Sequence, residues 1–191
     1  MNNTLVLNRE LTFSRTANAA IGVVFFVLAT AFGAYVRIPL PGTPVPMTLQ
    51  TLFVALSGAV LGKRFGPLSQ VSYILLGVIG LPIFQGYGSG AAHLFGPTGG
   101  YLMGFTAASY IVGIMLGNGS YSTARIASAF AAGTVALYGA GIAWLMTLYR
   151  ISLHDAVTIG LIPFLAAEVI KIFAAALIYR AVEARSRSIF S

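Results

Sequence analysis

Two oppositely charged residues stand three positions apart in an apolar stretch near the C-terminal end of the chain. Residues 164–178 read FLAAEVIKIFAAALI, and Glu168 and Lys171 are the only charges between Asp155 and Arg180. Each charge at the centre of a membrane helix would cost roughly 2.5–3.5 kcal/mol on insertion scales. Positions i and i+3 share one helix face, so the pair could grip the polar edge of a ligand or simply neutralise itself. The residues alone leave both interpretations open.

A second group of candidate residues lies in a glycine-rich stretch, LPIFQGYGSGAAHLFGPTGGYLMG, residues 81–104, which we call loop three. Glycines at this density let backbone amides approach a ligand, or let a loop fold over one as a lid. A flexible linker would show Ser and Gly alone. This stretch instead carries polar and aromatic side chains, namely Gln85, Tyr87, His93, Thr98 and Tyr101.

The sequence lacks the usual motifs for nucleotide binding, metal binding and covalent catalysis. In GYGSGAAH, His93 stands where the third glycine of G-x-G-x-x-G belongs, and no G-x-x-x-x-G-K-[ST] string occurs. His93 and His154 have no metal-ligand spacing, and the chain has no cysteine. We therefore expect no cofactor, no metal and no catalytic residue, and we interpret the protein as a non-enzyme.

The composition indicates an integral membrane protein. The 191 residues are 58% hydrophobic and only 8% charged, with a mean hydropathy of +0.88. Soluble domains carry about 25% charged residues. The net charge of +7 is spread singly or in pairs between apolar runs, which fits loops that set topology and does not fit a nucleic-acid surface. We therefore expect the protein to lie in a lipid bilayer.

Six apolar segments predict an all-α bundle of six transmembrane helices. They cover about residues 17–36, 47–61, 67–81, 99–116, 123–148 and 157–179. The second and third are shorter than the ~20 residues of an upright span. Lys63 and Arg64 lie between them and would be costly at membrane depth, which favours two short helices over a re-entrant pair. We predict one membrane domain, 1–191, with an N-terminal segment 1–15, a bundle 16–181 and a tail 182–191.

The basic residues predict the orientation of this bundle. One side of a six-span arrangement holds eight of them, Arg9, Arg15, Lys63, Arg64, Arg125, Arg180, Arg185 and Arg187, and the other side holds Arg37 and Arg150. Cytoplasmic loops of membrane proteins are the ones enriched in Lys and Arg. Both termini should therefore be cytoplasmic, in a multi-pass protein of the cytoplasmic membrane.

Several strings in order resemble a known family. They are PLPGTPVPMTLQTLFVALSGAVLGKRFG, YILLGVIGLPIF, GPTGGYLMGF and the acidic-x-x-Lys of the last segment. Over roughly residues 20–180 the chain resembles the BioY family, the biotin-specific substrate-binding (S) components of energy-coupling-factor (ECF) vitamin transporters. The resemblance implies six helices and an external biotin site closed by loop one (RIPLPGTPVPMTLQ, residues 37–50) and loop three. It also implies a transmembrane coupling protein and two cytoplasmic ATPases, which would supply the energy.

Carried over to this sequence, the resemblance implies a biotin site of named residues. A lysine donor beside a carboxylate acceptor suits the ureido group, which has one carbonyl and two N–H groups. Aromatic side chains could wall the fused rings. Backbone amides of loop three, His93 or a nearby Arg could bind the valerate carboxylate. The expected ligand-binding residues are Gln50, Gln85, Gly86, Tyr87, Gly88, His93, Tyr101, Trp144, Glu168 and Lys171.

The sequence differs from the usual BioY family pattern at some positions, and one alternative function stays open. Glu168 stands where the family usually has Asp, and Ala29 and Gly33 are the nearest match to the Ala-x-x-x-Ala pattern through which S components dock. The alternative function is an ion-coupled secondary carrier for biotin or a related small carboxylate, with Glu168 as the coupling carboxylate. Inverted repeats are typical of such carriers, and the E-x-x-K element has no twin in this chain.

Overall fold

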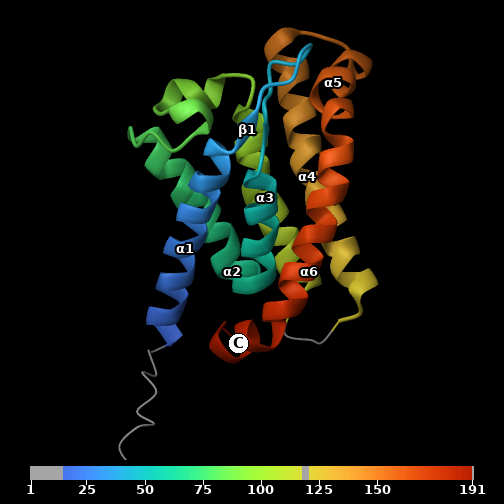
Figure 1. Ribbon diagram of the computed structural model, residues 1–191. Coiled ribbons are helices and arrows are strands. Elements are labelled where there is room, and N and C mark those ends of the chain that lie inside the picture. Colours follow the sequence, from blue (N-terminus) through green and yellow to red (C-terminus); the bar gives the residue numbers. More distant parts are fainter. Residues whose placement is uncertain (1–14, 118–120, 191) are drawn as a thin grey trace, which may run out of the picture.

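The computed structural model describes residues 15–117 and 121–190, which are mostly helical (Figure 1). The predicted N-terminal segment, residues 1–15, lies outside this range except for Arg15, where the first helix begins. The α-helices are α1 (Arg15–Tyr35), α2 (Gln50–Val78), α3 (Gly99–Met115), α4 (Thr123–Tyr149), α5 (Leu153–Gly160) and α6 (Leu165–Phe190). The short elements are the strands β1 (Arg37–Ile38) and β2 (Met47–Thr48) and the 3-10 helices η1 (Gln85–Tyr87), η2 (Ala91–Phe95) and η3 (Ile162–Phe164).

Helix α2 consists of two arms, residues 50–61 and 63–78, that meet at a break. Gly62 has φ 73° and ψ −177°, a backbone conformation that favours glycine because it has no Cβ. The arms then run back along each other. Gln50 Nε2 donates to Tyr73 Oη at 2.8 Å, and Gln70 Nε2 donates to Ser57 Oγ at 3.1 Å. The second and third apolar segments are thus the two arms of one helical hairpin.

Small residues bring α3 into close contact with this hairpin. A Cβ added to Gly58 would lie 2.1 Å from the carbonyl oxygen of Ser109, and a Cβ added to Gly113 would lie 2.5 Å from the backbone nitrogen of Lys63. Ser57 Oγ and Ser109 Oγ share a hydrogen bond of 2.8 Å across the same contact. Close helix packing over small residues, with buried hydroxyl bonds, is typical of helices in lipid.

The helices have the length and apolar surface of a membrane-embedded bundle. Three stretches among the described residues are long and apolar enough to cross a membrane, Thr16–Tyr35, Thr123–Tyr149 and Leu153–Ala184, and α3 is a shorter apolar helix. Large apolar side chains on α1, such as Val24, Phe25, Leu28 and Phe32, face outward. Such a surface is costly in water and favourable in lipid.

The sixth apolar segment, predicted as one helix over residues 157–179, is interrupted, which corrects that prediction. Helix α5 ends at Gly160, η3 follows, and α6 begins at Leu165. Pro163 supplies the reason, because it has no backbone N–H and disfavours helical geometry in the residue before it. Glu168 consequently lies in the first turn of α6, where the helix dipole favours a carboxylate. Helix α6 also continues through most of the predicted tail, to Phe190.

The connections that form the candidate site gather at one end of the bundle, opposite the start of α1 and the end of α6 (Figure 1). Loop one is stiffened by a short antiparallel ladder in which Arg37 pairs with Thr48 and Ile38 with Met47. Loop three contains η1 and η2 and leads into α3. Segments far apart in sequence thereby meet above the helices.

Candidate functional site

The two charges of α6 form a buried ion pair. Glu168 is 4% exposed and Lys171 is 8% exposed, and Lys171 Nζ contacts Glu168 Oε1 directly. Lys171 Nζ also donates to Thr51 Oγ1 at 2.6 Å and to the carbonyl oxygen of Thr48 at 3.0 Å. The ammonium therefore joins α6 to loop one and to the first arm of α2.

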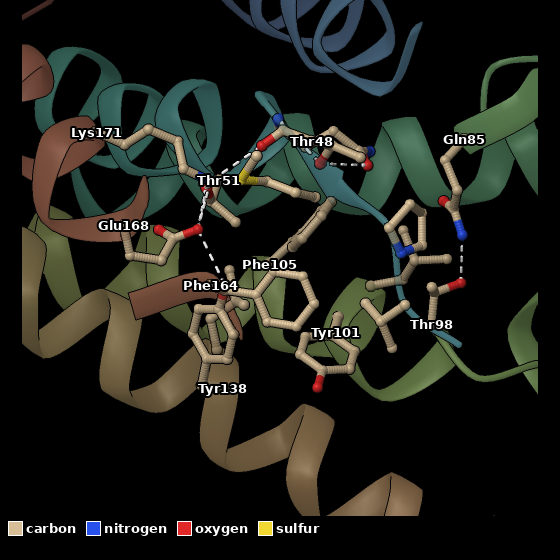
Figure 2. Close-up of a pocket in the computed structure, with 16 residues that line it drawn as sticks. Thr48, Thr51, Gln85, Thr98, Tyr101, Phe105, Tyr138, Phe164, Glu168 and Lys171 are labelled. Carbon is tan, nitrogen blue, oxygen red and sulfur yellow. Dashed lines mark hydrogen bonds and ion pairs between the residues drawn. The ribbon is translucent and has the colours of Figure 1, made fainter. Parts of the chain in front are cut away.

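Glu168 collects further donors on the same oxygen. Its Oε1 accepts hydrogen bonds from Thr51 Oγ1 at 3.1 Å and from Tyr138 Oη at 3.0 Å, as Figure 2 shows. Thr51 thus accepts from the lysine and donates to the carboxylate. Buried charges are tolerated when they are paired and hydrogen-bonded in this way. The pair is held in one geometry by three different helices, α2, α4 and α6.

A pocket that is partly open to solvent lies over this pair. Small-molecule sites combine apolar walls with a few placed polar groups. The walls here are apolar and aromatic, and the polar groups come from loop one, the start of α2, η1 and the start of α3. The lining residues are Val45, Pro46, Met47, Thr48, Gln50, Thr51, Gln85, Thr98, Tyr101, Leu102, Phe105, Leu137, Tyr138, Phe164, Glu168 and Lys171.

Hydrogen bonds fix the upper part of the pocket. Gln85 Nε2 donates to Thr98 Oγ1, which ties η1 to the N-terminal end of α3 (Figure 2). Thr48 Oγ1 donates to Gln50 Oε1 at 3.3 Å, and Gln50 in turn donates to Tyr73. Loop one is therefore anchored to the α2 hairpin, and η1 of loop three is anchored to the start of α3.

Five of the ten residues predicted from sequence line this pocket, namely Gln50, Gln85, Tyr101, Glu168 and Lys171. The ring of Tyr101 faces the pocket, while its hydroxyl donates to the carbonyl oxygen of Gly160 at 2.7 Å. The structure therefore brings the E-x-x-K element together with one glutamine from each of the two loops.

The other five predicted residues, Gly86, Tyr87, Gly88, His93 and Trp144, do not line the pocket. Tyr87 is 72% exposed and stacks on Tyr35, with ring centroids 4.8 Å apart. His93 stacks on Phe84, and burial lowers its pKa, which favours a neutral imidazole. Their role as ligand-binding residues stays a prediction.

Trp144 is turned toward the helix interface. Its Nε1 donates to the carbonyl oxygen of Gly96 at 2.9 Å. A Cβ added to Gly100 would lie 2.2 Å from Trp144 Cβ, so the tryptophan packs where α4 meets the start of α3. In this structure it supports the end of loop three and does not wall the pocket.

Sequence reasoning missed several residues around the charge pair, above all Thr51 and Tyr138. Thr51 had a usable signal, because it directly follows Gln50 in the PVPMTLQT string. Tyr138 had none, since nothing in the sequence of α4 shows that it meets α6.

Among the described residues, no group of three His, Cys, Asp or Glu side chains could hold a metal ion. The pocket is built to hold a mostly apolar molecule by a polar edge.

Comparison with known proteins supports a family assignment. The model of the BioY family matches residues 4–188. The biotin transporter BioY of Thermotoga maritima is 40% identical over 80% of this chain and 88% of its own length. The probable biotin transporter BioY of Pyrococcus horikoshii is 36% identical over 82% of this chain and 90% of its own.

A solved structure shares the fold. The S-component for biotin from an ECF-type ABC transporter has a TM-score of 0.82 and covers 89% of this chain and 93% of that chain, at 24% identity. With a family model that spans nearly all of its residues, this chain belongs to the BioY family.

Proposed function

We propose that this protein captures biotin outside the cell and serves as the substrate-specific subunit of an ECF-type uptake system. The observation that carries the proposal is the buried pair of Glu168 and Lys171 at the pocket, with Thr51 between them. The names of the relatives from Thermotoga maritima and Pyrococcus horikoshii point to the same ligand.

The pair matches the polar end of biotin. The ureido carbonyl would accept from Lys171 Nζ in exchange for one of its three present acceptors, and the ureido N–H groups would donate to the Glu168 carboxylate. Such bonds to charged groups are shorter and roughly twice as strong as neutral ones. The apolar walls, which include Phe105, Leu137 and Phe164, suit the fused rings. Biotin would then lie between loops one and three, with its ureido end against α6.

We further propose that the bundle crosses the cytoplasmic membrane six times, with the arms of α2 as two short spans. The turn of α2 carries Lys63 and Arg64, and the loop end of the bundle carries Arg37 and Arg150. The positive-inside rule then places the loops outside and both termini in the cytoplasm.

A protease test checks this topology. A tag at Ser191 should resist external protease in intact cells, whereas a tag inserted at Gly42 should be cut. Gly42 suits an insertion because it has φ +80° in the tip of loop one and no neighbouring atom near its Cβ position. The same tags in lysed cells are the control. Cleavage at Ser191 without lysis would contradict the six-span arrangement.

Energy for uptake would come from partners, a transmembrane coupling protein and two ATPases, because this sequence has no nucleotide-binding loop. The purified chain should therefore bind biotin in detergent, as seen by native mass spectrometry. In liposomes by itself it should not concentrate radiolabelled biotin. Protein-free liposomes and a Lys171→Ala variant are the controls. Uphill accumulation driven by an imposed proton or sodium gradient would favour the ion-coupled carrier instead.

A further inference from the structure

The lining of the pocket has no unpaired positive charge that could bind the carboxylate of an acidic ligand. Its lining contains one carboxylate, Glu168, and one ammonium, Lys171, and these neutralise each other. Gln85 and Thr98, on the opposite side, are bonded to each other. Biotin carries a carboxylate that is ionised at neutral pH, and an anion taken out of water without a partner is costly. A cation that binds this group would come from outside the lining.

Arg37 is placed to supply that cation. It is an exposed residue of β1, directly opposite Thr48, which lines the pocket. Its Nη1 lies only 2.6 Å from the position of a Cβ on Gly86, the neighbour of the lining residue Gln85. The guanidinium therefore reaches from loop one to the turn of loop three, beside the pocket.

Its charge is not already neutralised by the described part of the chain. The two ion pairs found there join Lys171 to Glu168 and Arg180 to Glu183, and neither involves Arg37. His93, another candidate for the carboxylate, lies stacked on Phe84 with its pKa lowered by burial. Arg37 is thus a cation beside the pocket that forms no ion pair among the described residues and can accept an anionic partner.

Gly86 gains a physical role from the same contact. It has φ +72°, a conformation that L side chains rarely adopt, and a Cβ there would collide with the Arg37 guanidinium. The glycine therefore makes room for the arginine. Its predicted contact with the ligand stays a prediction beside this role.

We propose that Arg37 binds the carboxylate of the ligand at the mouth of the pocket and attracts the anion before it enters. The inference rests on the proposed function. A guanidinium can hold a carboxylate through two parallel N–H···O bonds. Because Arg37 is exposed, water and salt weaken the interaction, so its effect is moderate and depends on ionic strength.

The test compares Arg37→Gln with Arg150→Gln, which removes an exposed charge at the C-terminal end of α4, outside the pocket lining. Each variant is titrated calorimetrically with biotin and with biotinamide, whose uncharged amide replaces the carboxylate. Arg37→Gln should weaken biotin binding about three- to fivefold and leave biotinamide binding unchanged, as expected for an exposed charged contact. Arg150→Gln should change neither affinity.

Association rates give a second readout. Raising the salt concentration should slow biotin association with the unaltered protein and with Arg37→Lys, and should affect Arg37→Gln much less. Equal losses for biotin and biotinamide in Arg37→Gln would show that Arg37 acts only by holding loop three, and unchanged affinity for both would place the carboxylate elsewhere. Either result overturns the inference while leaving biotin capture intact. Failure of the unaltered protein to bind biotin would overturn both.

Discussion

Lys171→Ala should weaken biotin binding at least about thirtyfold. Truncating one member of a buried charge pair typically costs about 2–5 kcal/mol of binding free energy. At 1.4 kcal/mol per tenfold change in affinity, the lower end of that range corresponds to about thirtyfold. The substitution removes a donor to the ligand. It also leaves Glu168, only 4% exposed, with Thr51 and Tyr138 as its remaining partners. Isothermal titration calorimetry of the purified protein measures the loss directly.

A double variant separates binding from scaffolding. Replacing Glu168 with Gln and Lys171 with Met keeps the side-chain volumes and removes both charges, and such exchanges are often neutral for stability. We expect this variant to insert and fold but to lose biotin. Glu168→Asp, a shorter carboxylate, should keep the affinity within about tenfold, or 1.4 kcal/mol. Full affinity in the double variant would show that the pair only supports the fold.

Lys171 also holds loop one through the carbonyl oxygen of Thr48, so stability must be followed alongside affinity. Thermal unfolding of each variant without ligand reports the structural part. Under our proposal, Lys171→Ala and the double variant share the loss of biotin, while their melting temperatures differ, since only the single variant leaves an unpaired charge buried.

Gly58→Ala should have the second largest effect, a marked loss of stability. A Cβ at this position would lie 2.1 Å from the Ser109 carbonyl oxygen and 2.9 Å from its carbon, and these are backbone atoms that cannot rotate away. Overpacking of this kind typically costs about 1–3 kcal/mol, and about 2–4 °C of melting temperature per kcal/mol at this chain size. The contact between α2 and α3 would have to open.

Gly139→Ala is the matched control, because nothing lies within 4 Å of the Cβ position at this other helical glycine. Alanine should there be neutral or raise stability by up to about 1 kcal/mol, through its better helix propensity. Fluorescence-monitored thermal unfolding in one detergent compares the two. Equal melting temperatures for Gly58→Ala and the unaltered protein would mean that the two helices are not held this closely.

The sequence by itself determined the class of the protein and the charge pair. Low charge and high hydropathy specify a membrane solvent whatever the fold, because they are sums over residues. The i,i+3 spacing of Glu168 and Lys171 is local, and the structure confirms that the two side chains lie on one helix face and form an ion pair. The break at Pro163 is also a local signal, although the apolar run around it is continuous.

The tertiary structure alone decided which side chains meet the pair and which loop residues face the pocket. Thr51 lies 117 positions from Glu168, and Tyr138 lies 30 positions from it. The sequence predicts Tyr87 and Trp144 as ligand contacts from their chemistry. In the structure, however, Tyr87 stacks on Tyr35, and Trp144 packs against the start of α3. Such contacts depend on how helices distant in sequence pack and on where irregular loops turn, and a periodic pattern contains neither.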